Sequence, residues 1–107
     1  MKKNKLNITK KTVRQIIKHV NILLDVDITI KRRLRSIVEP RQIIQAFLYY
    51  KSNLSLEEIA SFFSKSDSTV LHSAKIYSDL KPLFFKKYPL LFEYLDELEL
   101  KINKKLR

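Results

Sequence analysis

The chain has 107 residues, of which 45% are hydrophobic, and this is enough to bury the core of one domain. It contains no Gly and no Cys, which excludes glycine-rich phosphate-binding loops, disulfides and thiolate chemistry. The net charge of +11, from 22 Lys and Arg against 11 Asp and Glu, indicates a polyanionic partner: first nucleic acid, then an anionic membrane, then an acidic protein. The alternative is that part of this charge serves only solubility, in a sequence rich in Lys, Ile, Asn, Phe and Tyr.

The first predicted element is a helix that begins at Thr9 or Thr12 and ends near Leu24. Its apolar residues recur at three- and four-residue spacing, as on one face of an amphipathic helix: Val13, Ile16, Ile17, Val20 and Leu24. We predict that this helix packs in the core and follows a flexible, basic N-terminus over residues 1–9. His19 lies among polar positions and is expected at the surface.

The densest positive charge lies in residues 31–36, which read Lys-Arg-Arg-Leu-Arg-Ser. No acidic residue interrupts this run, and a predicted helix follows it. Such a run is often only a solvated surface. Arg nevertheless outnumbers Lys here, and its planar guanidinium suits contacts with phosphates and grooves, so we interpret the segment as a nucleic-acid contact.

The second predicted helix starts at Glu39 and Pro40, because Pro is tolerated in the first turn and Glu favours the positive end of a helix. Its expected buried residues are apolar and share one side: Ile43, Ile44, Phe47, Leu48 and Tyr50. The polar residues Arg41, Gln42 and Gln45 are expected to lie away from that side.

Two helices joined by a polar turn are predicted between residues 55 and 77. Ser55 and Glu58 form a capping box, and the helix that they start buries Leu56, Ile59, Ala60 and Phe63. Ser66 or Asp67 caps the next helix, which packs through Val70, Ala74 and Tyr77 and turns Ser68, Thr69 and His72 outward. The pattern is typical of a helix-turn-helix, although an ordinary helical hairpin with a solvated face shares it.

Ser78, Asp79 and Pro82 are predicted to end this helix, and residues 83–87 form a short helical piece. Pro89 opens a last helix with the apolar stripe Leu91, Tyr94, Leu95, Leu98 and Ile102. This helix also carries Glu93, Asp96, Glu97 and Glu99, so we expect it to face away from a polyanion. The chain is thus predicted to be all-α, with five or six helices and a single domain over residues 10–107.

Catalysis and metal binding are not indicated. Asp67, Ser68 and His72 have the residue types of a hydrolytic triad, but on one helix they do not place a base against a nucleophile. His19 and His72 are far apart, without Cys or an HExxH motif. We therefore expect no enzyme, cofactor or metal site, and no segment has the roughly 20 apolar residues of a membrane span.

Three motifs, in this order, resemble the C-terminal DNA-binding domain of the bacterial chromosomal replication initiator, DnaA. A basic loop runs into Pro-Arg-Gln, here KRRLRSIVEPRQ, and a helix follows that is similar to the family's RQIAxxL, here RQIIQAFL. The family signature of Ser-Leu-x-x-Ile-Gly, a turn and Arg-Asp-His-Ser-Thr-Val-Leu-His-Ala resembles SLEEIASFFSKSDSTVLHSA. The resemblance covers most of the chain beyond about Val13 and implies that domain's Trp-repressor-like fold with a central helix-turn-helix.

The resemblance also implies a mode of binding to double-stranded DNA. The family's basic loop places an Arg in the minor groove at the position of Arg33, with Lys31 and Arg35 beside phosphates and Arg32 in the same loop. The family's second signature helix lies in the major groove, and its contact positions match Lys65, Ser66, Asp67, Ser68 and Thr69, with His72 nearby. Gln42 matches a Gln that contacts the DNA backbone from a helix start.

Departures from the family bear on function. The turn before Val70 is one residue shorter, and the family's Arg-Asp-His becomes Lys65-Ser66-Asp67, so we expect a changed base preference. The initiator's ATPase region is missing, so we expect a stand-alone DNA-binding module in replication or transcription control, from a phage, plasmid or other mobile element, cytoplasmic and associated with the nucleoid. The alternative is a protein-interaction module whose C-terminal helix captures a host initiator or repressor.

Overall fold

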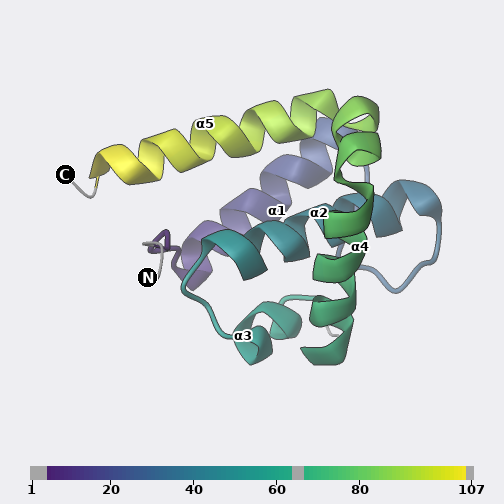
Figure 1. Ribbon diagram of the computed structural model, residues 1–107, viewed down its shortest axis with the longest axis horizontal. Coiled ribbons are helices and arrows are strands. Elements are labelled where there is room, and N and C mark those ends of the chain that lie inside the picture. Colours follow the sequence, from purple (N-terminus) through teal and green to yellow (C-terminus); the bar gives the residue numbers. More distant parts are fainter. Residues whose placement is uncertain (1–4, 64–66, 106–107) are drawn as a thin grey trace.

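The computed structural model describes residues 5–63 and 67–105, and within them the chain forms five helices. In chain order these are α1 Lys10–Leu24, α2 Arg35–Lys51, α3 Leu56–Ser61, α4 Asp67–Lys87 and α5 Pro89–Lys105. Figure 1 shows α4 crossing α2, with α3 beside the start of α4 and α5 on the opposite side of the view. The described residues pair as β-structure only in one isolated bridge, which confirms the all-α prediction. None of the described helices is both long and apolar enough to cross a membrane.

α1 begins and ends where the sequence predicts. The Thr9 hydroxyl accepts a hydrogen bond from the Thr12 backbone N–H at 3.2 Å, which satisfies one of the free N–H groups at the helix start. Asp25 follows the helix in the left-handed conformation, with φ of 54°, and its N–H donates to the Asn21 carbonyl. The predicted core residues Val13, Ile16, Ile17 and Val20 are buried.

The segment before α1 is partly built into the fold. Leu6 and Ile8 are buried in the hydrophobic core, in contrast to the flexible N-terminus expected from the sequence. The Leu6 N–H donates to the Lys51 carbonyl at 2.7 Å, and the Asn53 N–H donates to the Leu6 carbonyl at 3.2 Å. Backbone pairing with the end of α2 therefore holds this segment, and two apolar side chains anchor it.

α2 begins at Arg35, a full turn before Glu39 and Pro40, so the predicted start is wrong. Leu34 precedes the helix in an extended conformation without a side-chain cap, and the Val38 N–H bonds back to the Leu34 carbonyl. Pro40 consequently lies in the second turn, where it has no N–H to donate to the Ser36 carbonyl. Ser36 is exposed, so water can satisfy that carbonyl.

The buried side of α2 also differs from the prediction. The expected apolar residues Ile43, Ile44, Phe47 and Leu48 are buried. Arg41 and Gln45 are buried as well, although their polarity led us to place them elsewhere, whereas Tyr50 is exposed. The reason is that α3 and α4 both pack against α2, so more than one of its faces lies inside and polar positions are enclosed with the apolar ones.

The helix-turn-helix forms as predicted on both sides of its turn. The Ser55 hydroxyl accepts from the Glu58 N–H at 3.1 Å, and the Glu58 carboxylate accepts from the Ser55 N–H at 2.9 Å, which completes the capping box. α4 does not end after Tyr77 but continues to Lys87, with a kink at Leu80 (φ −111°, ψ 15°). Because Pro82 follows this kink closely, the predicted helix end is a bend, and residues 83–87 form the predicted helical piece beyond it.

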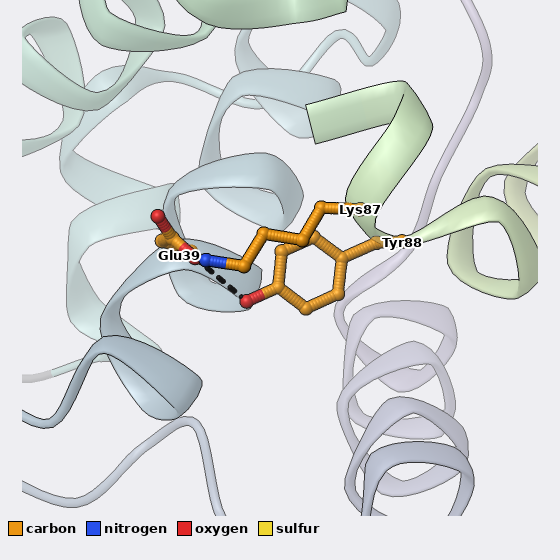
Figure 2. Close-up of polar contacts among 3 residues, drawn as sticks. All are labelled: Glu39, Lys87 and Tyr88. Atoms are coloured by element: carbon orange, nitrogen blue, oxygen red, sulfur yellow. Dashed lines mark hydrogen bonds and ion pairs between the residues drawn. The ribbon is translucent and has the colours of Figure 1, made fainter. Parts of the chain in front are cut away.

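Glu39 joins α2 to the junction of α4 and α5, as Figure 2 shows. Its carboxylate accepts from Lys87 Nζ at 2.6 Å and from Tyr88 Oη at 2.8 Å. Partial burial raises the pKa of Glu39, but the bonds from Lys87 and Tyr88 lower it by more, so its pKa lies below the ordinary value of 4.5. Burial and the neighbouring carboxylate raise the pKa of the Tyr88 phenol, which therefore remains a donor at neutral pH.

Glu39→Gln is expected to lower the free energy of unfolding at neutral pH by about 1–2 kcal/mol, because an amide does not form an ion pair with Lys87. A carboxyl group whose folded pKa is depressed stabilises the fold above its unfolded pKa, and this contribution is lost as the pH falls through the folded pKa. The variant should therefore lose less stability than the wild type on acidification below about pH 4.5. Urea unfolding across pH measures this, with the exposed Glu93→Gln as control; identical pH profiles for Glu39→Gln and the wild type would contradict the assignment.

Candidate nucleic-acid interface

The loop between α1 and α2 exposes its predicted contact residues. Lys31, Arg32 and Arg33 lie in this basic loop, Arg35 is the first residue of α2, and all four side chains are exposed. Residues 31–38 contain no Asp or Glu, so nothing within the segment neutralises its charge. The segment therefore presents a concentrated positive charge to solvent.

Arg41, a buried residue of α2, holds the backbone of the basic loop. Its Nε donates to the Ile28 carbonyl at 2.7 Å, and its Nη2 donates to the carbonyl of Ile30 at 2.5 Å and to that of Arg32 at 3.4 Å. The residue is only 6% exposed. Burial lowers the pKa of Arg41, and the Asp27 carboxylate opposes that shift. One buried guanidinium thus fixes three carbonyls of the segment that carries the exposed cations.

The chain leading into the basic loop is shaped by Asp27. The Thr29 hydroxyl and backbone N–H both donate to Asp27 Oδ1, at 2.6 Å and 2.9 Å. These two bonds lower the pKa of Asp27, so its carboxylate stays ionised at neutral pH. Asn21 Oδ1 on α1 accepts from the Ile28 N–H at 2.9 Å. The loop is therefore fastened to α1 as well as to α2.

The start of α4 presents the second group of predicted contact residues. Asp67, Ser68 and His72 are exposed and Thr69 is half-buried. Asp67 is the first described residue of α4, and the predicted contact residues Lys65 and Ser66 both lie outside the described residues. The opposite face of the helix packs inward through buried side chains: Val70, Ser73 and Ala74.

Close to these contact residues, Ser73 and Ala74 of α4 are hydrogen-bonded to α2. The Ser73 hydroxyl donates to Gln45 Oε1 at 2.5 Å, and the Tyr50 hydroxyl donates to the Ala74 carbonyl at 3.2 Å. Gln45 Nε2 is also buried, and no acceptor in the described part of the chain pairs with it. The Ser73 bond therefore turns the polar end of Gln45 toward α4.

The basic loop and α4 are positioned by neighbouring residues of one helix. Arg41 and Gln45 are four residues apart on α2, so they lie on the same face, one turn from each other. Because Arg41 holds the loop and Gln45 holds α4, α2 sets the position of one group of predicted contact residues relative to the other. Gln42 is half-buried and lies about two turns into α2, not at a helix start as predicted.

Sequence reasoning missed Arg41, Gln45 and Ser73 as parts of this site. A signal was available for the first two, because Arg41 and Gln45 share a four-residue spacing with Ile37, which is buried. A polar residue that falls on the apolar stripe of a helix indicates a buried group with a hydrogen-bond partner. No comparable pattern marks Ser73.

A family model described as the bacterial dnaA protein helix-turn-helix matches residues 9–76. The match begins at the N-cap of α1 and ends within α4, so it contains both the basic loop and the helix-turn-helix. It covers more than half of the chain and every residue that the sequence predicted to contact DNA.

Proposed function

Because the chain belongs to the family of the bacterial DnaA helix-turn-helix domain, we propose that it binds double-stranded DNA in the control of replication or transcription. In this proposal α4 lies in the major groove and the basic loop contacts the minor groove. The observation that carries it is the pairing of Arg41 and Gln45, which hold the loop and α4 from one face of α2. Two contact elements at a fixed separation are what the regular grooves of a duplex require.

In the basic loop, Arg33 is the residue proposed to enter the minor groove. A narrow, A·T-rich minor groove has an enhanced negative potential that favours an inserted guanidinium. Lys31, Arg32 and Arg35 are proposed to contact phosphates on either side, where they add affinity without reading sequence. All four side chains are exposed, and the carbonyls held by Arg41 set where they project.

At the start of α4, the proposed contacts combine positioning and reading. Ser68 and Thr69 offer hydroxyls that suit phosphates, and the Thr69 methyl group suits a thymine methyl. His72 can donate or accept a hydrogen bond, and Asp67 accepts only, which favours a cytosine amino group. Lys65, Ser66 and Gln42 complete the proposed set, with Gln42 contacting the DNA backbone from α2.

Duplex binding measured over a salt series tests this function. With roughly six phosphate contacts, the logarithm of the affinity should fall with the logarithm of salt concentration at about −0.9 per contact. Selection of bound duplexes from a random pool would then reveal the preferred site. Failure to bind any duplex, or an affinity that does not depend on salt, would contradict the proposal.

Arg33→Ala is expected to weaken duplex binding by about 1–3 kcal/mol, with the larger loss at A·T-rich sites, because the minor-groove contact disappears. Lys86→Ala is the matched control, since it removes an exposed cation at the far end of α4. Titration of both variants at one salt concentration measures the difference, and circular dichroism checks that both are folded. Equal affinities for the two variants would rule out the role given to Arg33.

A further inference from the structure

α1 presents an outer face on which every charged residue is basic. Residues 10–24 contain no Asp or Glu, and Lys11, Arg14 and Lys18 are exposed on the side opposite the core. Ile22 lies on the same side and is 73% exposed. A groove of about 680 Å³ runs along this face toward α3, where the Arg14 guanidinium lies 5.9 Å from the centre of the Phe62 ring. The face therefore combines positive charge with exposed apolar surface.

α5 presents the opposite chemistry on its own outer face. Leu90, Glu93, Glu97 and Leu100 are spaced by three, four and three residues, which places them on one side of the helix. Glu93 and Glu97 are exposed, and the two leucines that flank them are 60% and 63% exposed. Lys101 follows after this acidic stretch. The inner side of α5 is already occupied in the core, whereas this acidic, leucine-flanked face is exposed to solvent.

The basic face of α1 and the acidic face of α5 belong to two helices that contact each other. The His19 ring on α1 stacks on the Tyr94 ring on α5, with 3.9 Å between ring centroids and 11° between planes. A groove between the two helices is lined by residues of both, including Glu93 and Glu97. Figure 1 also shows α1 and α5 as neighbours. A surface that carries a basic face on one helix and an acidic face on its neighbour presents complementary charges to a second copy rotated by 180°.

We propose that this surface joins two copies of the chain about a two-fold axis, with the basic face of α1 in each copy against the acidic face of α5 in the other. Charge complementarity identifies the occupant, because the acidic partner that the α1 face requires stands beside it in every copy. Leu90 and Leu100 supply apolar contacts toward Ile22 and the groove near Phe62. The residues proposed to contact DNA lie on other elements, so each copy keeps its DNA-binding surface free.

The association is expected to be weak in the absence of DNA. Two helix-to-face contacts belong to the smaller class of interface, below about 1,200 Å² in total, and the net charge of +11 on each copy adds repulsion. A dissociation constant of about 100 μM at moderate salt fits this class. High salt should weaken the dimer further, because the attraction comes from exposed charges.

Charge reversal on each face provides the test. Glu93→Lys with Glu97→Lys makes the α5 face basic and raises the net charge by four, to +15. Arg14→Glu with Lys18→Glu makes the α1 face acidic and lowers the net charge by four, to +7. Each double variant alone should dimerise at least tenfold more weakly than the wild type in sedimentation analysis, with circular dichroism confirming the fold.

A mixture of the two double variants should form a heterodimer with about the affinity of the wild type, although both chains are strongly positive. Their opposed faces then match at both contacts, and general electrostatic attraction does not explain such an outcome. A wild-type chain that stays monomeric up to about 1 mM, or a mixture that does not associate, overturns the proposal. A monomeric wild type together with weaker binding of the Arg14→Glu, Lys18→Glu variant to a single duplex would instead assign the α1 face to DNA.

Discussion

Arg41→Met is expected to lower the free energy of unfolding by about 2–4 kcal/mol and to weaken duplex binding at the same time. The side chain donates to the carbonyls of Ile28, Ile30 and Arg32, and Met has a similar length but no donor. These three carbonyls then lose their donor and must accept hydrogen bonds from water, so the basic loop should move away from α2. Urea unfolding measures the first effect, and titration of a duplex under conditions where the variant is folded measures the second.

Arg32→Met is the matched control for this experiment. It makes the same chemical change on an exposed side chain nearby and leaves the Arg32 carbonyl in place for Arg41. It should change stability by less than about 0.5 kcal/mol and affect only DNA binding. Equal stabilities of the Arg41→Met and Arg32→Met variants would show that Arg41 does not hold the loop.

Val70→Asp is expected to unfold the protein, because it should lower the free energy of unfolding by about 3–5 kcal/mol. Val70 is fully buried on the inner face of α4, where it belongs to the hydrophobic core cluster. An unpaired charge at such a site is among the most destabilising changes that a point substitution can make. Loss of the helical circular dichroism signal at 25 °C, or a lowered thermal midpoint, records the effect.

Leu71→Asp tests whether the destabilisation comes from burying a charge on the inner face of α4 and not from placing an Asp anywhere in this helix. Leu71 is the next residue and is 44% exposed, so an Asp there remains in contact with water. The variant should fold with nearly wild-type stability, and Ala74→Asp should behave like Val70→Asp because Ala74 is buried. A folded Val70→Asp variant would show that the inner face of α4 has been assigned to the wrong residues.

The helices of this chain could be predicted from the sequence because each carries a local pattern. The spacing of apolar residues marks α1 and α5, and the Ser55–Glu58 capping box marks the start of α3. The start of α2 could not be predicted in this way. The Leu34 side chain forms no capping hydrogen bond, so the sequence carries no signal that marks Arg35 as the first residue of the helix. Pro40 gave a misleading signal, because Pro is typical of the first turn of a helix and here lies in the second. Pro82, by contrast, was an informative signal, because the predicted break in α4 coincides with the kink at Leu80.

The predicted contact residues and the residues that position them differ in how visible they are in the sequence. Lys31, Arg32 and Arg33 are exposed, as a dense basic run suggests. Arg41 and Gln45 belong to the site through partners that are distant along the chain: loop carbonyls in one case and Ser73 on α4 in the other. The residue type alone points to the surface, and only the packing of α3 and α4 on α2 places these side chains inside.

The residues that position the DNA-binding surface are separate from those proposed to touch DNA, and this has a consequence for how new binding preferences arise. The side chains proposed to touch DNA are mostly exposed, whereas Arg41 and Gln45, which position them, are buried. Substitutions at exposed positions usually change stability by less than about 0.5 kcal/mol. A lineage can therefore sample many side chains at Lys31, Arg33 or His72 without approaching the threshold at which the chain unfolds. The fold therefore tolerates substitutions at the exposed contact residues and is destabilised by substitutions at the buried residues that position them. This makes the domain a suitable starting point for libraries in which new DNA target sequences are selected.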